Sequence, residues 1–155
     1  MKANVSMQKF NRTYWYNDIE IMTLSLKYPC IMLYNNDRYE YTGGAHGMTV
    51  RSSNTFELRT GTQIPLYCYF KKGIDYKLLL TQEMIKQAND QLKDNPGIYF
   101  DNYEELIAQN FTENHYFLTP EGLSLYFQHY DIAPYSTGIV VFTVPYKIIG
   151  WRPSC

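Results

Sequence analysis

The histidine with the most unusual surroundings in this chain lies in a loop that is rich in glycine, Gly43-Gly44-Ala45-His46-Gly47. Three glycines within five residues let the backbone adopt positive φ or approach another group closely, so the loop amides could cradle an anion. Phosphate loops, however, open a helix after a parallel strand, whereas both flanks here have the pattern of antiparallel strands. We therefore interpret this loop as a tight corner of the fold.

The chain has two further histidines, His115 and His129. A zinc site would need at least two histidines to converge, for example with Glu40 or Asp131, and none has the helical partner of an HExxH motif. The sequence also lacks a GxSxG motif, a Cys/His signature and a Walker loop, and its acidic residues single out no acid/base pair. We predict no catalytic residue, no metal site and no cofactor.

The three cysteines, Cys30, Cys68 and Cys155, are an odd number with no CxxC spacing. They can form one disulfide at most, and the sequence leaves open whether they form any.

Tyr135 lies in a second conspicuous connection, which runs from Asp131 to Gly138. Pro134 fixes one φ there and Gly138 frees another, so a rigid connection could hold Tyr135 outward as a contact residue. The alternative is that Tyr135 packs back under the sheet with its hydroxyl bonded to the backbone. Both interpretations stay open at this stage.

The elements that must position these loops are mostly strands. Two short apolar runs, Leu123–Phe127 and Ile139–Val144, have the composition of central strands. Thr119-Pro120-Glu121-Gly122 before the first run favours a turn, so Tyr116–Leu118 is expected to pair back as a hairpin. The core is therefore predicted to be antiparallel.

The first half of the chain also has the pattern of strands. Turn-forming clusters at Asn17-Asp18 and at Asn35-Asn36-Asp37 predict two of its breaks, and Met48–Leu58 has strand character.

The period changes after Gly73. Apolar positions at steps of three and four predict a helix over residues 75–93, with one stripe toward the core. These positions are Ile74, Leu78, Thr81, Ile85, Ala88 and Leu92. A second helix is expected over residues 102–109, because Glu104 and Glu105 suit its first turn. Strands, then helices, then strands predict an α+β two-layer sandwich, a mainly antiparallel sheet with two helices packed on one face.

Composition limits the class of partner. The length of 155 residues fits one domain, and a formal net charge of -1 gives no basic surface for nucleic acid. No window approaches the roughly 18 apolar residues of a membrane-spanning helix, and the N-terminus lacks the apolar core of a signal peptide. The 16 tyrosines suit half-exposed strands, and they equally suit a recognition surface.

Several motifs in order resemble one known family. They are Tyr39-Glu40-Tyr41-Thr42-Gly43-Gly44-Ala45-His46-Gly47, Phe56-Glu57-Leu58-Arg59-Thr60-Gly61, Tyr116-Phe117-Leu118, Gly122-Leu123, Tyr130-Asp131-Ile132-Ala133-Pro134-Tyr135 with Gly138, and Val144-Pro145-Tyr146. The chain resembles, over about residues 24–146, the domain shared by the ectodomain of the lysozyme-sensing anti-sigma-V factor RsiV and the N-terminal region of the peptidoglycan deacetylase PdaC. The resemblance implies a bacterial α+β domain outside the cytoplasm that binds and does not catalyse.

The leading hypothesis is therefore one domain over residues 1–155 that acts as a non-catalytic binding module of the cell envelope. Its ligand would be a protein such as lysozyme or a peptidoglycan fragment. One alternative is an enzyme acting on the cell wall through a site near His46 and His129, and another is a structural domain that pairs through an exposed edge strand. The candidate ligand-binding residues are Gly43, Gly44, His46, Pro134 and Tyr135, which carry the family motifs in connections.

Overall fold

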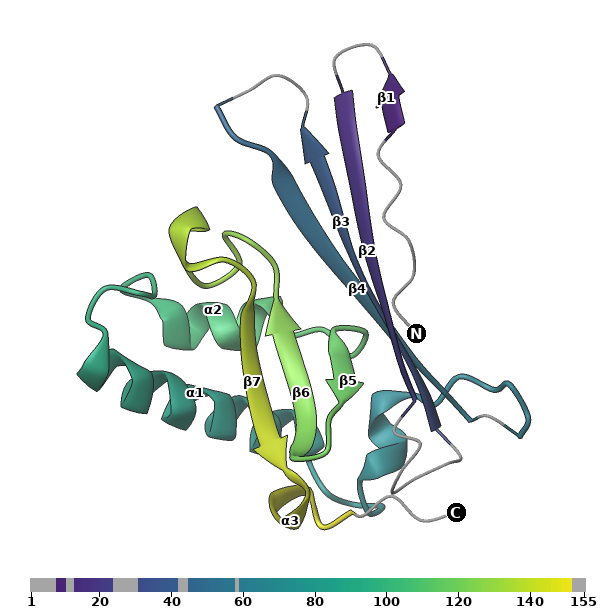
Figure 1. Cartoon of the computed structure of the whole chain (residues 1–155). Helices are drawn as coiled ribbons and strands as arrows, with labels where there is room; N and C mark the ends of the chain where they lie inside the picture. Colours follow the sequence, from purple (N-terminus) through teal and green to yellow (C-terminus); the bar gives the residue numbers. More distant parts are fainter. Residues whose placement is uncertain (1–7, 11–12, 24–30, 42–44, 58, 152–155) are drawn as a thin grey trace.

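The computed structural model (Figure 1) describes residues 8–10, 13–23, 31–41, 45–57 and 59–151. Its strands form two antiparallel sheets, and two helices cover one face of the smaller sheet. The predicted α+β class, with mainly antiparallel strands and two helices on one sheet face, is confirmed. The strands divide between two sheets, which the sequence did not indicate. That residues 1–155 form one domain stays a prediction.

The larger sheet has four strands, and each pairs with the next one along the chain. They are β1 (Gln8–Phe10), β2 (Thr13–Thr23), β3 (Ile31–Tyr41) and β4 (Met48–Glu57). Three of these strands are ten or eleven residues long, so the sheet extends well beyond the smaller one (Figure 1).

The predicted turns at Asn17-Asp18 and Asn35-Asn36-Asp37 are wrong, because both segments lie inside strands. Asn and Asp favour turns when their side chains bond to the local backbone. In this sheet the segment from Asn35 to Asp37 instead pairs with the polar residues Arg51–Ser53 of β4. The Arg51 guanidinium also forms a cross-strand ion pair with the Asp37 carboxylate, which favours the strand conformation of this segment over a turn.

The predicted strand Met48–Leu58 is confirmed over Met48–Glu57 as β4, while Leu58 lies outside the described residues. The two faces of β4 differ in burial. Met48 is 38% exposed and Val50 is 48% exposed, whereas Ser53 and Thr55 are buried. The face that carries Ser53 and Thr55 is turned toward the rest of the molecule. The other face of β4 therefore displays apolar side chains to solvent.

The smaller sheet confirms the predicted second hairpin. It consists of β5 (Tyr116–Leu118), β6 (Gly122–Phe127) and β7 (Val140–Pro145), with β6 in the middle and buried along its whole length. Gly122 is needed where β6 meets β7, because a Cβ there would lie 2.2 Å from the Val144 carbonyl oxygen. The two sheets meet where β4 runs beside β5, yet no ladder joins them within the described residues.

The two predicted helices are confirmed as α1 (Tyr76–Asp94) and α2 (Tyr103–Asn110), and a short α3 (Tyr146–Ile149) follows β7. The Asp75 carboxylate accepts a hydrogen bond from the Leu78 amide and so caps the N-terminus of α1. Gln87 of α1 donates a hydrogen bond of 3.1 Å to the Thr143 carbonyl of β7, which ties the helix to the sheet.

The stripe predicted for α1 is partly wrong. The buried face consists of Leu80, Met84 and Ala88, whereas Ile74 and Leu78 are about half exposed. Three successive leucines, Leu78 to Leu80, allow more than one phase of the helical stripe. The position of β7 selects the phase that buries Leu80, and the sequence pattern does not reveal this.

Candidate functional site

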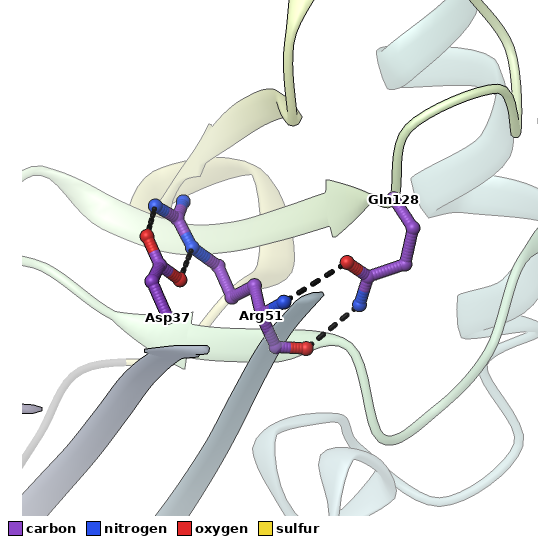
Figure 2. A network of polar contacts seen from close by, with 3 residues as sticks. All are labelled: Asp37, Arg51 and Gln128. Atoms are coloured by element: carbon purple, nitrogen blue, oxygen red, sulfur yellow. Dashed lines mark hydrogen bonds and ion pairs between the residues drawn. The ribbon is translucent and has the colours of Figure 1, made fainter. Parts of the chain in front are cut away.

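The outer edge of β4 is bound by side chains from the connection between β6 and β7. Gln128, directly after β6, accepts a hydrogen bond from the Arg51 amide at 3.0 Å and donates one to the Arg51 carbonyl at 2.7 Å (Figure 2). Because these backbone groups of Arg51 point away from β3, Arg51 and Asp37 form a pair that is not hydrogen-bonded through the ladder. The Gln128 amide thus occupies the place that a fifth strand would take.

The Arg51 side chain points the other way, toward β3. Its Nε and Nη2 bind the two carboxylate oxygens of Asp37 at 2.8 and 2.7 Å (Figure 2). This is the planar, bidentate geometry in which arginine and carboxylate pair best. The Arg51 guanidinium also lies 5.9 Å from the centre of the Tyr126 ring of β6. One residue of β4 therefore contacts both sheets.

Four aromatic and histidine side chains cover the same edge at the start of β4, and we call them the aromatic cluster: His46, His129, Tyr130 and Tyr135. The Tyr135 ring stacks with His46 at a centroid distance of 3.9 Å and with His129 at 4.5 Å. Two imidazole rings this close to the Tyr135 ring would collide if they lay on the same face of it. The Tyr135 ring therefore lies between the His46 and His129 rings.

Hydrogen bonds fix the orientation of the cluster. The Tyr135 hydroxyl donates to the Gly47 carbonyl at 2.7 Å, and His46 Nδ1 lies 3.0 Å from the same oxygen. A carbonyl can only accept, so His46 Nδ1 carries the hydrogen, and in the neutral ring Nε2 can accept from the Tyr130 hydroxyl 3.4 Å away. Gly47 itself is buried against the Tyr39 ring, where a Cβ would come within 2.1 Å of Cζ.

The structure brings some of the predicted site residues together. His46 and Tyr135 stack on each other, and Pro134 directly precedes the short 3-10 helix η2 (Tyr135–Thr137) that carries Tyr135. Gly43 and Gly44 lie outside the described residues. That these five residues bind a ligand stays a prediction. The Tyr135 hydroxyl bonds to a backbone carbonyl, as the second interpretation of Tyr135 expects for that group, and the half-buried ring stacks on His46 and His129.

The geometry limits what His46 and His129 can do together. Their rings are separated by the Tyr135 ring, so they cannot both contact one substrate atom or one metal ion in this arrangement. Among the described residues, no group of three His, Cys, Asp or Glu side chains is placed to hold a metal ion. What the cluster does offer is stacked rings and one half-exposed phenol.

That phenol is part of an exposed surface that the sequence analysis missed. Tyr130 is 48% exposed and adopts a positive φ of 67°, which is uncommon for a bulky residue. Its hydroxyl lies 3.4 Å from His46 Nε2, and His46 comes shortly before the exposed Met48 and Val50 of β4 in the chain. We call His46, Met48, Val50 and Tyr130 the β4 patch. The alternation of Met48 and Val50 with polar neighbours is the sequence signal for its strand part, and His46 was already among the candidate residues.

A polar pocket of about 390 Å³ lies along β4 beyond Arg51. Its lining residues come from β4, from the loops before α1 and β5, and from β6; they are Arg51, Ser52, Ser53, Asn54, Gln63, Asn114, His115 and Tyr126. His115 stacks on Tyr126 at 4.7 Å, and its buried Nδ1 has no hydrogen-bond partner among the described residues. Burial lowers the pKa of His115, and the nearby Asp131 carboxylate acts in the opposite direction. The pocket therefore contains a neutral imidazole at pH 7.

The family profile described as "Protein of unknown function (DUF3298)" matches residues 70–147, from the loop before α1 to α3. This match covers half of the chain, so the chain belongs to the DUF3298 family. No curated protein matches it in sequence. Among the described residues, none of the helices has the length and apolar character needed to cross a bilayer.

Two crystal structures of DUF3298 family proteins share the fold. One is from Pseudomonas aeruginosa PAO1, with 22% identity and a TM-score of 0.64 over 90% of this chain and 62% of that one. The other is from Bacteroides fragilis NCTC 9343, with 28% identity and a TM-score of 0.63 over 91% of this chain and 55% of that one. The chain thus spans less than two thirds of the length of either relative.

Proposed function

We propose that the chain is a non-catalytic binding module that works outside the cytoplasm at a bacterial cell envelope. Its ligand is a protein such as lysozyme or a peptidoglycan fragment. The observation that carries this proposal is the β4 patch, where large apolar and aromatic side chains are exposed on β4 and in the connections next to it. Such exposed groups gather at protein interaction sites more often than on the rest of a surface.

The choice of compartment and ligand rests on the resemblance in motifs. Residues 39–47, 116–118, 130–135 and 144–146 follow the order found in the RsiV ectodomain and the N-terminal region of PdaC, and two bacterial DUF3298 proteins share the fold. In RsiV-like proteins this ectodomain binds lysozyme. In PdaC-like proteins the chemistry belongs to a separate domain.

The contacts around the β4 patch suit a protein ligand. The aromatic cluster, which shares His46 and Tyr130 with the patch, is held by bonds to the Gly47 carbonyl. Its rings therefore need little ordering on binding, and pre-ordered aromatic groups lose less entropy when they are covered. Val50 and Met48 add apolar area on the exposed face of β4. Exposed apolar and aromatic side chains of this kind are suited to contact with another protein.

The test is a calorimetric titration of the purified chain with a c-type lysozyme, repeated over a series of salt concentrations. We expect micromolar or tighter binding, which corresponds to about 8 kcal/mol or more. Tyr130→Ala should weaken it by about tenfold or more, as the loss of an interface aromatic does. Tyr67→Ala is the matched control, because Tyr67 is 55% exposed on the separate 3-10 helix η1 (Leu66–Tyr69).

Three results would count against the proposal. Absence of binding would remove lysozyme as the ligand. An equal loss in Tyr67→Ala and Tyr130→Ala would remove the β4 patch as the contact surface. Hydrolysis of peptidoglycan by the purified chain would overturn the non-catalytic role and favour the alternative site near His46 and His129.

A further inference from the structure

The pocket beyond Arg51 has a lining that suits one class of ligand. Three residues with carboxamide side chains, Asn54, Gln63 and Asn114, line it together with Ser52 and Ser53. Each carboxamide can both donate and accept hydrogen bonds. The Ser53 hydroxyl already donates to the Tyr116 carbonyl, so the carboxamides are the main source of donors and acceptors for a ligand.

The charges at the pocket cancel. Arg51 is the one cationic residue in the lining, and its guanidinium is bound in both positions by the Asp37 carboxylate. Desolvation lowers the pKa of His115, so this side chain adds no charge near neutral pH. An anionic ligand would have to compete with Asp37 for the guanidinium, and a cationic ligand would find no unpaired carboxylate among the lining residues.

Some of the lining amides retain bonding capacity. Gln63 donates one hydrogen of its amide to the Asn54 oxygen at 3.0 Å, which leaves the Gln63 oxygen and the Asn54 amino group for a ligand. Asn114, also in the lining, is exposed. The volume of about 390 Å³ lies within the range of roughly 300–1,000 Å³ that is typical of small-molecule sites.

We propose that this pocket binds a neutral sugar residue that carries hydroxyl and acetamido groups, as one unit of a longer glycan. Hydroxyl groups and an acetamido group match the mixed donors and acceptors of Asn54, Gln63 and Asn114 without needing charge. Because the pocket is open, a glycan can continue from it into solvent. This inference rests on the binding role proposed above, and it does not depend on the β4 patch.

The experiment is an NMR titration of the full chain with chitotetraose, the tetramer of N-acetylglucosamine, which follows the side-chain amide signals. We expect saturable shifts of the Asn54, Gln63 and Asn114 signals at millimolar ligand. The double variant Asn54→Ala/Asn114→Ala should bind about three- to tenfold more weakly per lost hydrogen bond. Gln82→Ala is the matched control, because Gln82 is an exposed amide on α1.

The outcomes separate this inference from the lysozyme proposal. Shifts that do not saturate, or that spread evenly over exposed amides such as Gln82, would overturn the pocket as a sugar site. Equal binding of cellotetraose, which lacks acetamido groups, would overturn the acetamido part. Tyr130→Ala should leave the glycan titration unchanged. A loss of glycan binding in that variant would show that the two surfaces are not independent, which also contradicts the inference.

Discussion

Replacing Gln128 by Ala tests how the two sheets are held together. The substitution removes two hydrogen bonds to the Arg51 backbone, at 3.0 and 2.7 Å. Each such bond contributes about 0.5–1.5 kcal/mol net, and the exposed-edge groups that lose their partner can be partly rehydrated. We therefore expect the free energy of unfolding to fall by about 1–3 kcal/mol, which urea denaturation can measure. At this chain length that corresponds to a decrease in Tm of roughly 2–4 °C per kcal/mol.

A second substitution, Gln128→Glu, makes the test specific. The carboxylate can still accept from the Arg51 amide, but its other oxygen would face the Arg51 carbonyl, which also only accepts. This contact disfavours the charged form, so the pKa of Glu at this position should be higher in the folded than in the unfolded state. A protonated Glu donates to the carbonyl as Gln128 does, so the variant should approach wild-type stability as the pH falls through the raised pKa.

The comparison uses the difference in stability from the wild type at each pH, so that the other titrating groups cancel. Gln82→Ala serves as the control and should stay within about 0.5 kcal/mol of the wild type. Our account of the junction would be refuted if Gln128→Ala lost less than about 0.5 kcal/mol. It would also be refuted if Gln128→Glu matched the wild type at pH 7.

Two further predictions concern a position with no room for a side chain and a partly buried histidine. Gly122→Ala should cost about 1–3 kcal/mol, because the added Cβ meets the Val144 carbonyl and forces β6 and β7 apart, whereas the exposed Glu121→Ala should cost less than about 0.5 kcal/mol in the same urea experiment. The second concerns His115, whose pKa is lowered by burial. As the pH falls below about 6.5, the unfolded chain binds a proton at His115 before the folded chain does. Between pH 7 and 5, acidification should therefore lower the free energy of unfolding more for the wild type than for His115→Gln. Equal changes of the free energy of unfolding with pH in the two proteins would contradict this.

Local signals predicted the second half of the chain well. The period of three and four residues after Gly73 predicted a helix over residues 75–93, which agrees with α1 to within one residue at each end. The turn-forming residues Thr119 to Gly122 likewise predicted the hairpin of β5 and β6. In both cases the residues that decide the structure are neighbours in sequence, so the pattern contains the answer.

The long strands could not be predicted in the same way. Asn35 to Asp37 has the composition of a turn, and its strand conformation depends on Arg51 and its neighbours across the β3–β4 ladder. The phase of α1 likewise depends on β7, which lies about fifty residues later. These outcomes depend on partners distant in sequence, and a single sequence does not identify such partners.

The candidate site shows the same limit. The glycine-rich loop and the connection around Pro134 each stood out in the sequence, and His46 and Tyr135 were named from them. Their stacking, the position of His129 on the second ring face and the exposure of Tyr130 depend on how the two connections meet. No local sequence pattern predicts how these two connections pack against each other.

The junction also bears on where a ligand can bind. The family profile covers residues 70–147, yet Tyr116 and Tyr126 of that segment are only 5% and 2% exposed, because the first half of the chain covers them. Ser53 of β4 donates to the Tyr116 carbonyl, and the Tyr116 hydroxyl donates to the Ile64 carbonyl. The β4 patch is likewise assembled from both sides, with Tyr130 after β6 and Val50 on β4. A ligand bound at this patch or in the neighbouring pocket therefore contacts both halves of the chain. Changes in the pairing of β4 with Gln128 should accordingly alter ligand binding at both surfaces.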